Sequence, residues 1–377
     1  MSTSQQPATI GAEFDYLATQ EPDVDPLCRR TEPTKRSAVV ATMRDEGLVI
    51  LEWVAHYRAL GFHTIVVYTN DNTDGSDDLL LALHRAGVIN WIQNVVPGDL
   101  SPQLKAYRHA FWFSPEVARH DWVMFIDADE FLIPLRNGTL AQIGDYIEQI
   151  EALGASSISL NWQWFAGEGE FAPSNGLLAE RYRDALPHDH VKTLFRLRDA
   201  ASIDAHHAEL VDGLAVNGDG QPRTSTLPHL EEPAWKLGHI NHYWNRSFQE
   251  YYVKRQRGRG VSDRTLRDIS AFFSWGRIGH IKRVTHPRPE HLSRVRAGIE
   301  SLRSLPGVAD AERAVAEAFR RRVGTPEVRA MYDQGLAAQT AEMTAPPLPT
   351  LKSDERLVWG GIVVTSPPDG ETWPGIE

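Results

Sequence analysis

Apolar runs of strand length alternate with amphipathic stretches along the first third of the chain. The runs are Ser37–Met43, Thr64–Tyr68, Val88–Val95 and Trp122–Ile126. Between them, apolar residues recur at helical spacing over 48–60, 79–86 and 102–113; Gly61 and Gly87 follow the first two stretches, and Ser101–Pro102 opens the third. Strands and helices joined by short links in this order predict an α/β fold with a doubly wound, mostly parallel sheet and helices on both faces.

The rest of the chain is expected to form further strands, then helices, and finally a proline-rich tail. Further strands are expected at Ile158–Phe165, Lys192–Leu197, Ile203–Leu210 and Leu237–Trp244, and helices at Phe248–Arg257, Pro289–Leu302, Asp310–Arg322 and Pro326–Ala338. The tail is rich in proline and is expected to be extended, with one short edge strand at Val358–Thr365. The expected parts are a loosely packed, mobile leader (1–35), a main domain (36–260, with halves 36–135 and 136–260), a helical C-terminal extension (261–345) and the tail (346–377).

Four residues at the end of the fourth predicted strand, Asp127, Ala128, Asp129 and Glu130, stand out chemically. Ligands of open α/β sheets bind beyond the carboxyl ends of the strands. If the strand continues, Asp127 and Asp129 point the same way, and two converging carboxylates call for a cation such as Mg²⁺ or Mn²⁺. Such an ion would neutralise a diphosphate. The competing interpretation is that these acids only cap a turn or helix.

A series of motifs in this order resembles a known family. Its members are Met43–Glu46, Leu51–Tyr57, Leu60–Gly61, Tyr68–Asn70, Thr73–Gly75 and Trp122–Leu132 with its Asp-Ala-Asp-Glu-Phe core. Over about residues 37–260 the chain resembles the family-2-like glycosyltransferases of the GT-A fold, in the branch related to family 92. The resemblance implies metal-dependent transfer of a sugar from a nucleotide-diphosphate donor to a glycan or glycolipid acceptor such as bacterial polysaccharide. The expected nucleotide is UDP, with GDP as the second choice. It also implies an inverting outcome.

The resemblance assigns metal and nucleotide roles to particular residues. It implies that Asp129 binds Mn²⁺ or Mg²⁺ directly, while Asp127 lies nearer the ribose and shares the metal. A histidine well downstream commonly completes the metal sphere; we expect His242, with His207 as the alternative. Nucleotide binding is expected at Arg44, Glu46, Asn70, Asp71 and Asp74, although turn and cap chemistry would also explain the last three. Gln103 and Arg108, on the third predicted helix, either border the donor or form a solvated face.

The remaining roles concern phosphate, acceptor and base. Lys254 and Arg257 share one helix face and are expected with Lys192 at the diphosphate. Trp162 and Trp164 either stack on an acceptor sugar or pack in the core. Many inverting relatives carry a Glu-Asp pair after the metal-binding acids, but this chain shows none at an obvious position, so Glu168 and Asp189 are the general-base candidates and the inverting outcome stays open.

Composition narrows the function classes. With 39 basic and 50 acidic residues, the net charge of -11 argues against nucleic acid as a partner. The single Cys28 excludes an internal disulfide framework. No signal peptide and no apolar stretch of membrane-spanning length is visible, so we expect a cytoplasmic enzyme with at most peripheral membrane contact. Two alternatives remain: a non-catalytic nucleotide-sugar or glycan-binding protein on the same fold, favoured by the missing Glu-Asp pair, and a nucleotidyl- or phosphotransferase, which would share a metal-bound diphosphate site.

Overall fold

The computed structural model describes residues 6–24, 32–165, 167, 169–223, 233–257, 268–273, 282–283, 289–344, 357–359 and 362–364. Its contacts divide the chain into two units, Met1–Leu336 and Ala337–Glu377. The sheet and the candidate site described below belong to the first unit. Glu168 lies outside the described residues, as do residues 1–5 and 25–31 of the expected leader, which include Cys28.

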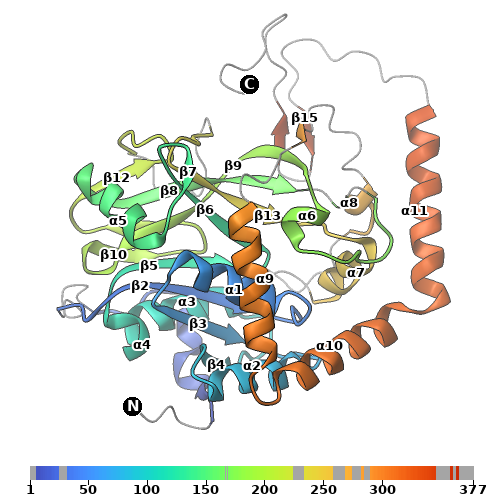
Figure 1. Ribbon diagram of the computed structural model, residues 1–377, viewed down its shortest axis with the longest axis horizontal. Helices are drawn as coiled ribbons and strands as arrows, with labels where there is room; N and C mark the ends of the chain where they lie inside the picture. The colour runs from blue at the N-terminus through green and yellow to red at the C-terminus, as the bar shows by residue number, and fades with distance from the viewer. Residues whose placement is uncertain are drawn as a thin grey trace, which may run out of the picture. The chain divides into compact units, whose positions relative to one another are not determined.

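The first unit is organised around one large sheet, whose described strands follow the order β1-β4-β3-β2-β5-β9-β8-β13-β6-β7 (Figure 1). Its first half is parallel and contains β1 (Ala8–Ile10), β4 (Asn90–Asn94), β3 (Thr64–Thr69), β2 (Lys35–Met43) and β5 (His120–Asp127). Thr42 of β2 lies opposite Tyr68 of β3 on one side and Asp127 of β5 on the other. The carboxyl ends of these three strands therefore meet at one edge, where such sheets bind ligands.

Helices cover both faces of this half. The helices α1 (Ile50–Leu60), α2 (Ser76–Arg85) and α5 (Ile143–Ala152) pack on one face; α3 (Pro102–Phe113), α4 (Pro115–Ala118) and the 3₁₀ helix η1 (Ala12–Ala18) pack on the other. Along β2, Val39 and Ala41 enter the first core while Ala38 and Val40 enter the second, as strand alternation requires. The predicted doubly wound α/β fold is confirmed.

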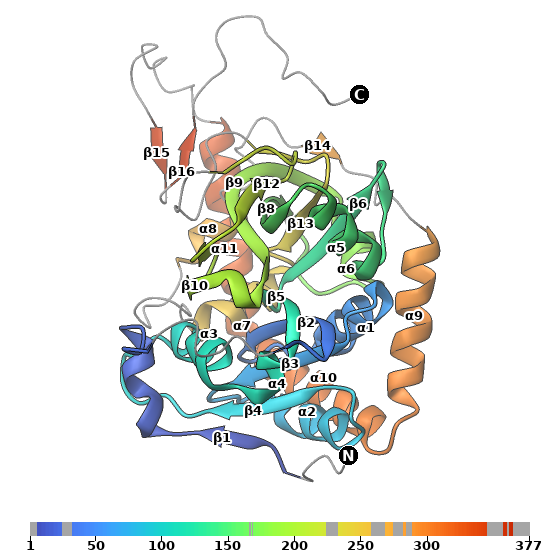
Figure 2. The same cartoon turned by 90° about the vertical axis from the view of Figure 1, so that its left-hand side faces the viewer.

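The second half of the sheet is mixed. Strand β9 (Asp184–Arg196) runs antiparallel to both β5 and β8 (Ala155–Phe165), while β13 (Gly238–Tyr243) runs parallel to β8 and antiparallel to β6 (Glu130–Arg136). Short strands β7 (Thr139–Leu140), β12 (Leu214–Asn217) and β14 (Lys282–Arg283) join it at the margins, and α6 (Leu178–Arg181) precedes β9. Figure 2 shows this half stacked above the parallel half. The parallel character expected for the sheet is thus concentrated in the first 127 residues.

Helix α7 (Phe248–Gln256) ends the expected main domain. The described helices of the expected C-terminal extension are α8 (Ser270–Phe273), α9 (Pro289–Arg303), α10 (Val308–Val323) and α11 (Pro326–Thr344). Helix α9 contacts α1, and α10 contacts α2 and α7. A side chain at Gly298 of α9 would lie 3.2 Å from the Ala55 Cβ of α1, so a glycine permits this close approach. His291 of α9 hydrogen-bonds His56 of α1, with their ring nitrogens 2.9 Å apart.

The N-terminal segment differs from the expected loose leader. Over residues 8–18 it adds β1 to the sheet edge beside β4 and then forms η1. Ile10 and Leu17 are buried, and the Lys105 ammonium of α3 donates to Asp15 at 2.7 Å and to the Gly11 carbonyl at 2.9 Å. Arg108 of α3 contacts this segment through Glu21, at 3.2 Å, so its described partner is the N-terminal segment.

Two of the expected strands are each a pair of shorter antiparallel strands in the structure. Ile203–Leu210 is split between β10 (Ala200–Ile203) and β11 (Ala208–Leu210), which pair antiparallel. The Asp204 carboxylate accepts from the backbone N–H groups of His206 and His207 at 2.6 and 2.7 Å, which fixes the turn. In the tail, β15 (Leu357–Trp359) and β16 (Ile362–Val364) pair with each other, where one edge strand was expected.

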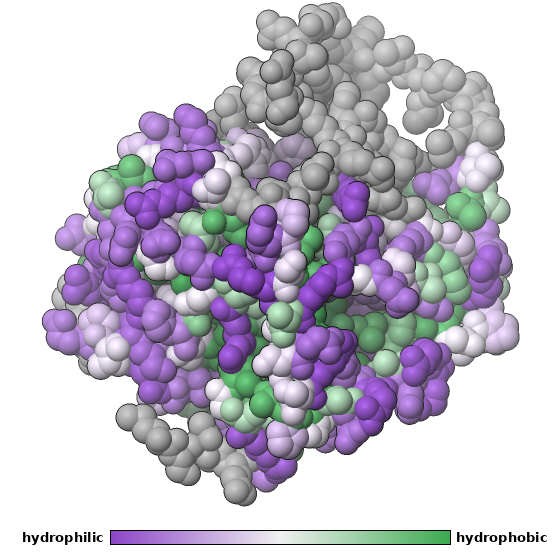
Figure 3. All heavy atoms as spheres, viewed as in Figure 1, coloured by the Kyte–Doolittle hydropathy of each residue, from purple (hydrophilic) through white to green (hydrophobic). Residues whose placement is uncertain are grey.

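The surface in Figure 3 is mainly hydrophilic, with smaller hydrophobic patches between. Among the residues that the structure describes, no helix combines the length and the apolar composition needed to cross a bilayer.

Candidate functional site

The two acids of the Asp-Ala-Asp-Glu core do not continue one strand. Strand β5 ends at Asp127, Ala128 and Asp129 form a turn, and β6 begins at Glu130. The alternation on which the common orientation of Asp127 and Asp129 was predicted is therefore interrupted, and each carboxylate has its own set of partners. Both still lie at the carboxyl edge of the parallel half.

Asp127 is fixed from three directions. Its Oδ1 atom accepts hydrogen bonds from Tyr107 Oη, at 2.9 Å, and from Gln103 Nε2, both on α3. Its Oδ2 atom lies 3.1 Å from Lys192 Nζ of β9. Asp127 is the more accessible of the two acids, with 29% of its side chain exposed. Its contacts hold the carboxylate in one orientation, as a group that positions a ligand requires.

Lys192, expected at the diphosphate, is fully buried beneath Asp127. Its ammonium also lies 3.4 Å from Glu130 Oε2 and donates to the Ala205 carbonyl at 2.7 Å. Burial alone would lower the pKa of Lys192, but Asp127 and Glu130 outweigh it and raise the pKa. Glu130 is buried too, and this burial raises its pKa well above the usual range. Lys192 therefore balances the negative charge of Asp127 from the buried side of the site.

Asp129 is almost entirely buried and belongs to a different cluster. Its Oδ2 atom forms an ion pair with Lys254 of α7 and lies 3.4 Å from His242 Nε2 of β13. Burial would raise the pKa of Asp129, but the positive charge of Lys254 and the contact with His242 outweigh it and hold the pKa well below its usual range. Lys254 also donates to the Trp244 carbonyl at 2.8 Å.

The Asp129–His242 pair has donors suited to a divalent metal ion. Burial lowers the pKa of His242, which keeps its imidazole neutral and able to coordinate. A carboxylate oxygen and an imidazole nitrogen 3.4 Å apart can share one ion, because each metal bond would be about 2.0–2.2 Å long. Lys254 contacts the same oxygen, so an ion there requires its ammonium to move aside. His207, the alternative ligand, is paired with Asp204 at 2.8 Å.

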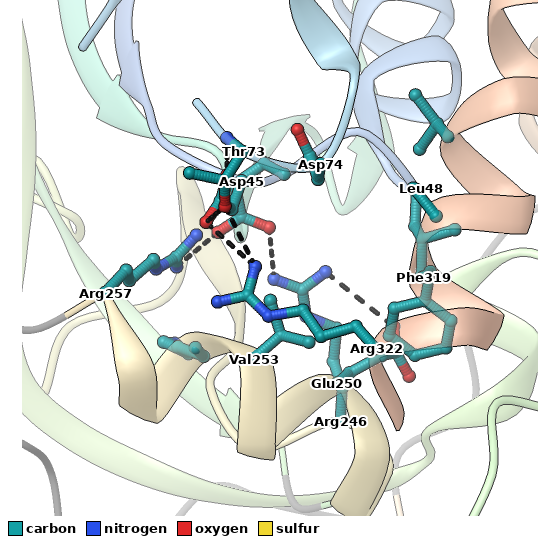
Figure 4. Close-up of a pocket in the computed structure, with 14 residues that line it drawn as sticks. Asp45, Leu48, Thr73, Asp74, Arg246, Glu250, Val253, Arg257, Phe319 and Arg322 are labelled. Carbon is teal, nitrogen blue, oxygen red and sulfur yellow. Dashed lines mark hydrogen bonds and ion pairs between the residues drawn. The ribbon is translucent and has the colours of Figure 1, made fainter. Parts of the chain in front are cut away.

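A cavity of about 140 Å³ adjoins this cluster, between the ends of β2 and β3 and helices α7 and α10 (Figure 4). Its lining comprises Asp45, Glu46, Leu48, Thr73, Asp74, Arg246, Glu250, Val253, Lys254, Arg257, Val315, Ala318, Phe319 and Arg322. The guanidinium groups of Arg246, Arg257 and Arg322 point towards the acids at the end of β2. Glu46 lies 2.6 Å from Arg246 and 2.5 Å from Arg257. The lining thus carries four basic and four acidic side chains, and each of the three arginines is paired with an acid. An anionic ligand would bind here by replacing a carboxylate in these pairs.

Of the five residues expected to bind the nucleotide, Glu46 and Asp74 line this cavity. Asp74 lines it, but both of its carboxylate oxygens accept backbone N–H bonds, from Gly47 at 2.8 Å and Ser76 at 3.0 Å, which is cap and turn chemistry. Asp71 is exposed in the turn after β3, where Asn70 Nδ2 donates to it at 3.2 Å.

Arg44 bonds the Arg257 carbonyl at 3.2 Å through its Nη1 atom. Its Nε atom is buried and has no hydrogen-bond partner among the described residues. Arg44 therefore has one buried donor that no described acceptor satisfies, and a ligand would reach it only after a local rearrangement.

A second cluster surrounds Trp162 of β8. His188, His190, His206 and His242 all pack against its indole, with ring centroids 4.3–5.5 Å away. Trp164 packs between His188 and Trp244. Both tryptophans are half-buried, and the buried Trp162 Nε1 atom has no hydrogen-bond partner among the described residues. Trp162 can therefore still offer a donor to a bound hydroxyl.

Asp189 lies beside this cluster with 48% of its side chain exposed. Its Oδ1 atom is 3.2 Å from His188 Nδ1 and 2.9 Å from His190 Nδ1. Burial, and secondly the nearby His190, lower the pKa of His188 to about 4. The sequence indicated a single acid at this position, whereas the structure places the Asp189 carboxylate beside two imidazoles.

Sequence reasoning missed several residues of the site. Arg246 is buried between Glu46 and Glu250, and Arg322 of α10 reaches Asp45 at 3.1 Å. The capping box of Ser247 and Glu250 was a signal for the start of α7 directly after Arg246. In the structure, a Cβ at Gly167 would lie 1.6 Å from the Arg246 carbonyl, so only glycine fits at this contact. For Arg322 no local signal exists.

Comparison with known proteins identifies a family. Residues 40–274, more than half of the chain, match the family model described as glycosyltransferase family 92. A glycosyltransferase family 92 protein from Oryza sativa subsp. japonica is 23% identical over 222 residues, which are 56% of this chain and 37% of that protein. The chain thus matches well under half the length of this curated relative.

Two solved structures are also similar. One is the mannosyltransferase PcManGT from Pyrobaculum calidifontis in complex with GDP-Man and Mn²⁺, with 13% identity, a TM-score of 0.32, and coverage of 88% of this chain and 93% of that one. The other is S. aureus TarS 1–349 in complex with UDP, with 12% identity, a TM-score of 0.31, and coverage of 89% and 98%.

Proposed function

The chain belongs to glycosyltransferase family 92, and we propose that it transfers a sugar from a nucleotide-diphosphate donor, UDP-sugar first, to a glycan or glycolipid acceptor in a reaction that needs Mn²⁺ or Mg²⁺. The observation that carries this proposal is the place of Lys254. Its ammonium contacts Asp129 at the candidate metal site, and the same side chain lines the cavity of arginines at the ends of β2 and β3. A metal site and an anion-binding cavity that share one lysine suit a metal-bound diphosphate.

Each side chain has a role in this proposal. Asp129 and His242 hold the metal, and Asp127, fixed by Tyr107 and Lys192, faces the ribose and the metal from the open side. The metal, when bound, stabilises negative charge on the diphosphate leaving group.

Lys254 and Arg257 bind the diphosphate, for which they leave Asp129 and Glu46. A direct contact between Lys192 and phosphate stays a prediction. In this proposal the buried Lys192 ammonium orients Asp127, which in turn contacts the ligand.

The nucleoside half of the donor lies over the ends of β2 and β3, beside Arg44, Glu46, Asn70, Asp71 and Asp74. Asp71 is the best placed of these to accept hydrogen bonds from a base or ribose, because it is exposed, whereas both oxygens of Asp74 are used within the turn. The buried Nε donor of Arg44 would reach the ligand after a local rearrangement.

The acceptor lies at Trp162 and Trp164, where a half-buried indole with an unbonded Nε1 donor can stack on a sugar ring and bond a hydroxyl. Inversion requires a base on the side of the acceptor opposite the leaving group. Among the described residues Asp189 is the candidate, beside the Trp162 cluster; Glu168 stays a prediction outside them.

A binding protein without turnover remains the second candidate, because the one described base candidate, Asp189, is engaged by two histidines. The nucleotidyltransferase alternative has no observation of its own in its favour. Bacterial polysaccharide as acceptor and the cytoplasm as location stay predictions.

Calorimetry with UDP, GDP, ADP and CDP, each with and without Mn²⁺, tests the proposal. We expect one nucleoside diphosphate to bind tightly only with the metal, and UDP release from a UDP-sugar once an acceptor glycan is added. Tight binding without any release supports the non-catalytic alternative. Absence of metal-dependent binding for all four nucleotides contradicts the donor site itself.

A further inference from the structure

We infer that His188, Asp189 and His190 form a second metal site, one for a transition metal of the Zn²⁺ or Co²⁺ class. The site is separate from Asp129 and His242 and does not depend on the proposed donor. It rests on a bulge in β9 that brings three ligand atoms together, on a buried residue that holds the bulge in shape, and on the chemical class of the three donors.

The bulge follows from the pairing of β9 with β8. Asn161 lies opposite Val191, but Gln163 lies opposite Pro187, so the three residues 188–190 stand against the single Trp162. A regular strand would send Asp189 to the face opposite its two neighbours. The extra residues remove this constraint, and ligand atoms of all three side chains lie within 4.8 Å of one another.

Asn161 holds the bulge in this shape. It is fully buried, and its Nδ2 atom donates to the carbonyls of His188 and Asp189 at 3.2 and 3.0 Å. Its Oδ1 atom accepts from the backbone N–H of Ala234 at 3.0 Å. The ligands are therefore presented by a backbone that is already fixed, which reduces the entropy cost of binding.

The spacing of the ligand atoms suits one ion. Asp189 Oδ1 lies 2.9 Å from His190 Nδ1 and 3.2 Å from His188 Nδ1. Ligands of a tetrahedral ion with bonds of about 2.1 Å are about 3.4 Å apart, so small outward shifts would admit the ion. His188 Nδ1 also accepts a bond of 3.2 Å from the His190 backbone N–H, which coordination would replace.

Two imidazoles and one carboxylate favour Zn²⁺, Co²⁺, Ni²⁺ or Cu²⁺ over Mg²⁺, which prefers oxygen ligands. Side-chain exposures of 48% for Asp189 and 35% for His190 leave a coordination position open to water. Packing of both imidazoles against Trp162 limits their rotation. A metal-bound Asp189 cannot also take a proton from an acceptor, so an ion at this site and the general-base role proposed for Asp189 exclude each other.

The test uses the full-length Asp129→Asn chain, in which the first metal site is disabled. After removal of bound metal with a chelator, Co²⁺ is titrated and its visible d–d absorption is followed, and Zn²⁺ is then added to displace it. We expect one Co²⁺ per chain with absorption typical of mixed nitrogen and oxygen ligands. Additional His188→Gln or His190→Gln substitutions should weaken Co²⁺ affinity at least about tenfold, whereas His239→Gln, on neighbouring β13, should not.

The outcomes separate this site from the donor site. His190→Gln in the otherwise unchanged chain should keep wild-type affinity for UDP with Mn²⁺, and its melting temperature shows whether it is folded. If Asp129→Asn binds no Co²⁺, or binds it equally well without His188 and His190, the bulge is not a metal site and Asp189 returns as the base candidate. Failure of the nucleotide to bind in the wild-type chain would affect only the proposed function.

Discussion

The carboxylates at the end of β5 and the carboxylate of the β9 bulge have neighbours of different kinds. Asp127 and Asp129 face the buried ammonium groups of Lys192 and Lys254. Asp189 faces the imidazoles of His188 and His190 and is half exposed. The two regions are connected through Trp162, which packs on both His242 and His190.

This difference decides what each region can bind. A lysine beside a carboxylate is a permanent positive charge, so a metal ion must displace it, and the displaced charge is then available to phosphate. A neutral imidazole is itself a ligand and does not need to leave. The β5 region therefore suits a metal that arrives together with an anion, and the bulge suits a metal alone.

The largest effect is expected at Asp129. Asp129→Asn should reduce Mn²⁺-dependent affinity for UDP at least about a hundredfold, about 3 kcal/mol, because the substitution removes the charge that holds the metal. Asparagine is preferred to alanine here because Asp129 is only 5% exposed and paired with Lys254. The amide removes the charge and keeps the size of the side chain. Calorimetry with Asp145→Asn, an exposed acid of α5, as control checks this. Unchanged affinity would place the metal elsewhere.

The two regions should also respond differently to pH. The pKa of His188 is about 4 in the folded chain against 6.5 unfolded, so the unfolded chain binds more protons between these values and stability falls as pH drops from about 6.5 to about 4. The lost contribution is at most about 3 kcal/mol. Asp129, with its lowered pKa, loses its contribution only as the pH falls below the unfolded value of 3.8.

Urea unfolding at pH 7, 5.5 and 4.5 compares the wild-type chain with His188→Gln, which keeps the other buried histidines. The variant should lose less stability over this range than the wild type. Parallel curves would mean that His188 is not kept neutral by burial.

Lys254→Met tests the competition between lysine and metal. Without nucleotide, Mn²⁺ affinity should rise about tenfold, because Asp129 no longer has a competing cation, while UDP affinity in saturating Mn²⁺ should fall about tenfold through loss of a phosphate ligand. Mn²⁺ should also raise the melting temperature of the variant more than that of the wild type. Lys236→Met, a surface lysine preceding β13, serves as control. A loss of both affinities would mean that Lys254 supports the metal site.

The smallest effect is expected at Asp71. Asp71→Ala should lower UDP affinity about five- to tenfold, about 1 kcal/mol, and leave inorganic diphosphate unaffected, since the proposed contact is with base or ribose. Asp74→Ala is unsuitable as a control because it removes the turn bonds to Gly47 and Ser76. Equal losses for UDP and diphosphate would move Asp71 out of the nucleoside pocket.

The sequence by itself determined the parallel half of the fold. Apolar runs, the Ser101 cap and the glycine after α1 act over a few residues, and the structure has β2, α1, β3 and α3 within about two residues of the predicted bounds. The position of Asp127 and Asp129 at a ligand-binding edge followed from the same pattern. Where a turn depended on one side chain, as at Asp204, the pattern read a hairpin as a strand.

Only the tertiary structure decided which charges meet. Lys254 reaches Asp129 across 125 positions of sequence, Lys192 reaches Asp127 across 65, and Arg322 reaches Asp45 across 277. The bulge that gathers His188, Asp189 and His190 likewise depends on how β9 registers against β8. Periodicity along the chain records which face of an element is buried, but it contains no information on which distant charge that face will find. Strand order and helix packing decide which charged side chains meet. A charge buried without a partner would destabilise the fold, so such charges are buried in pairs.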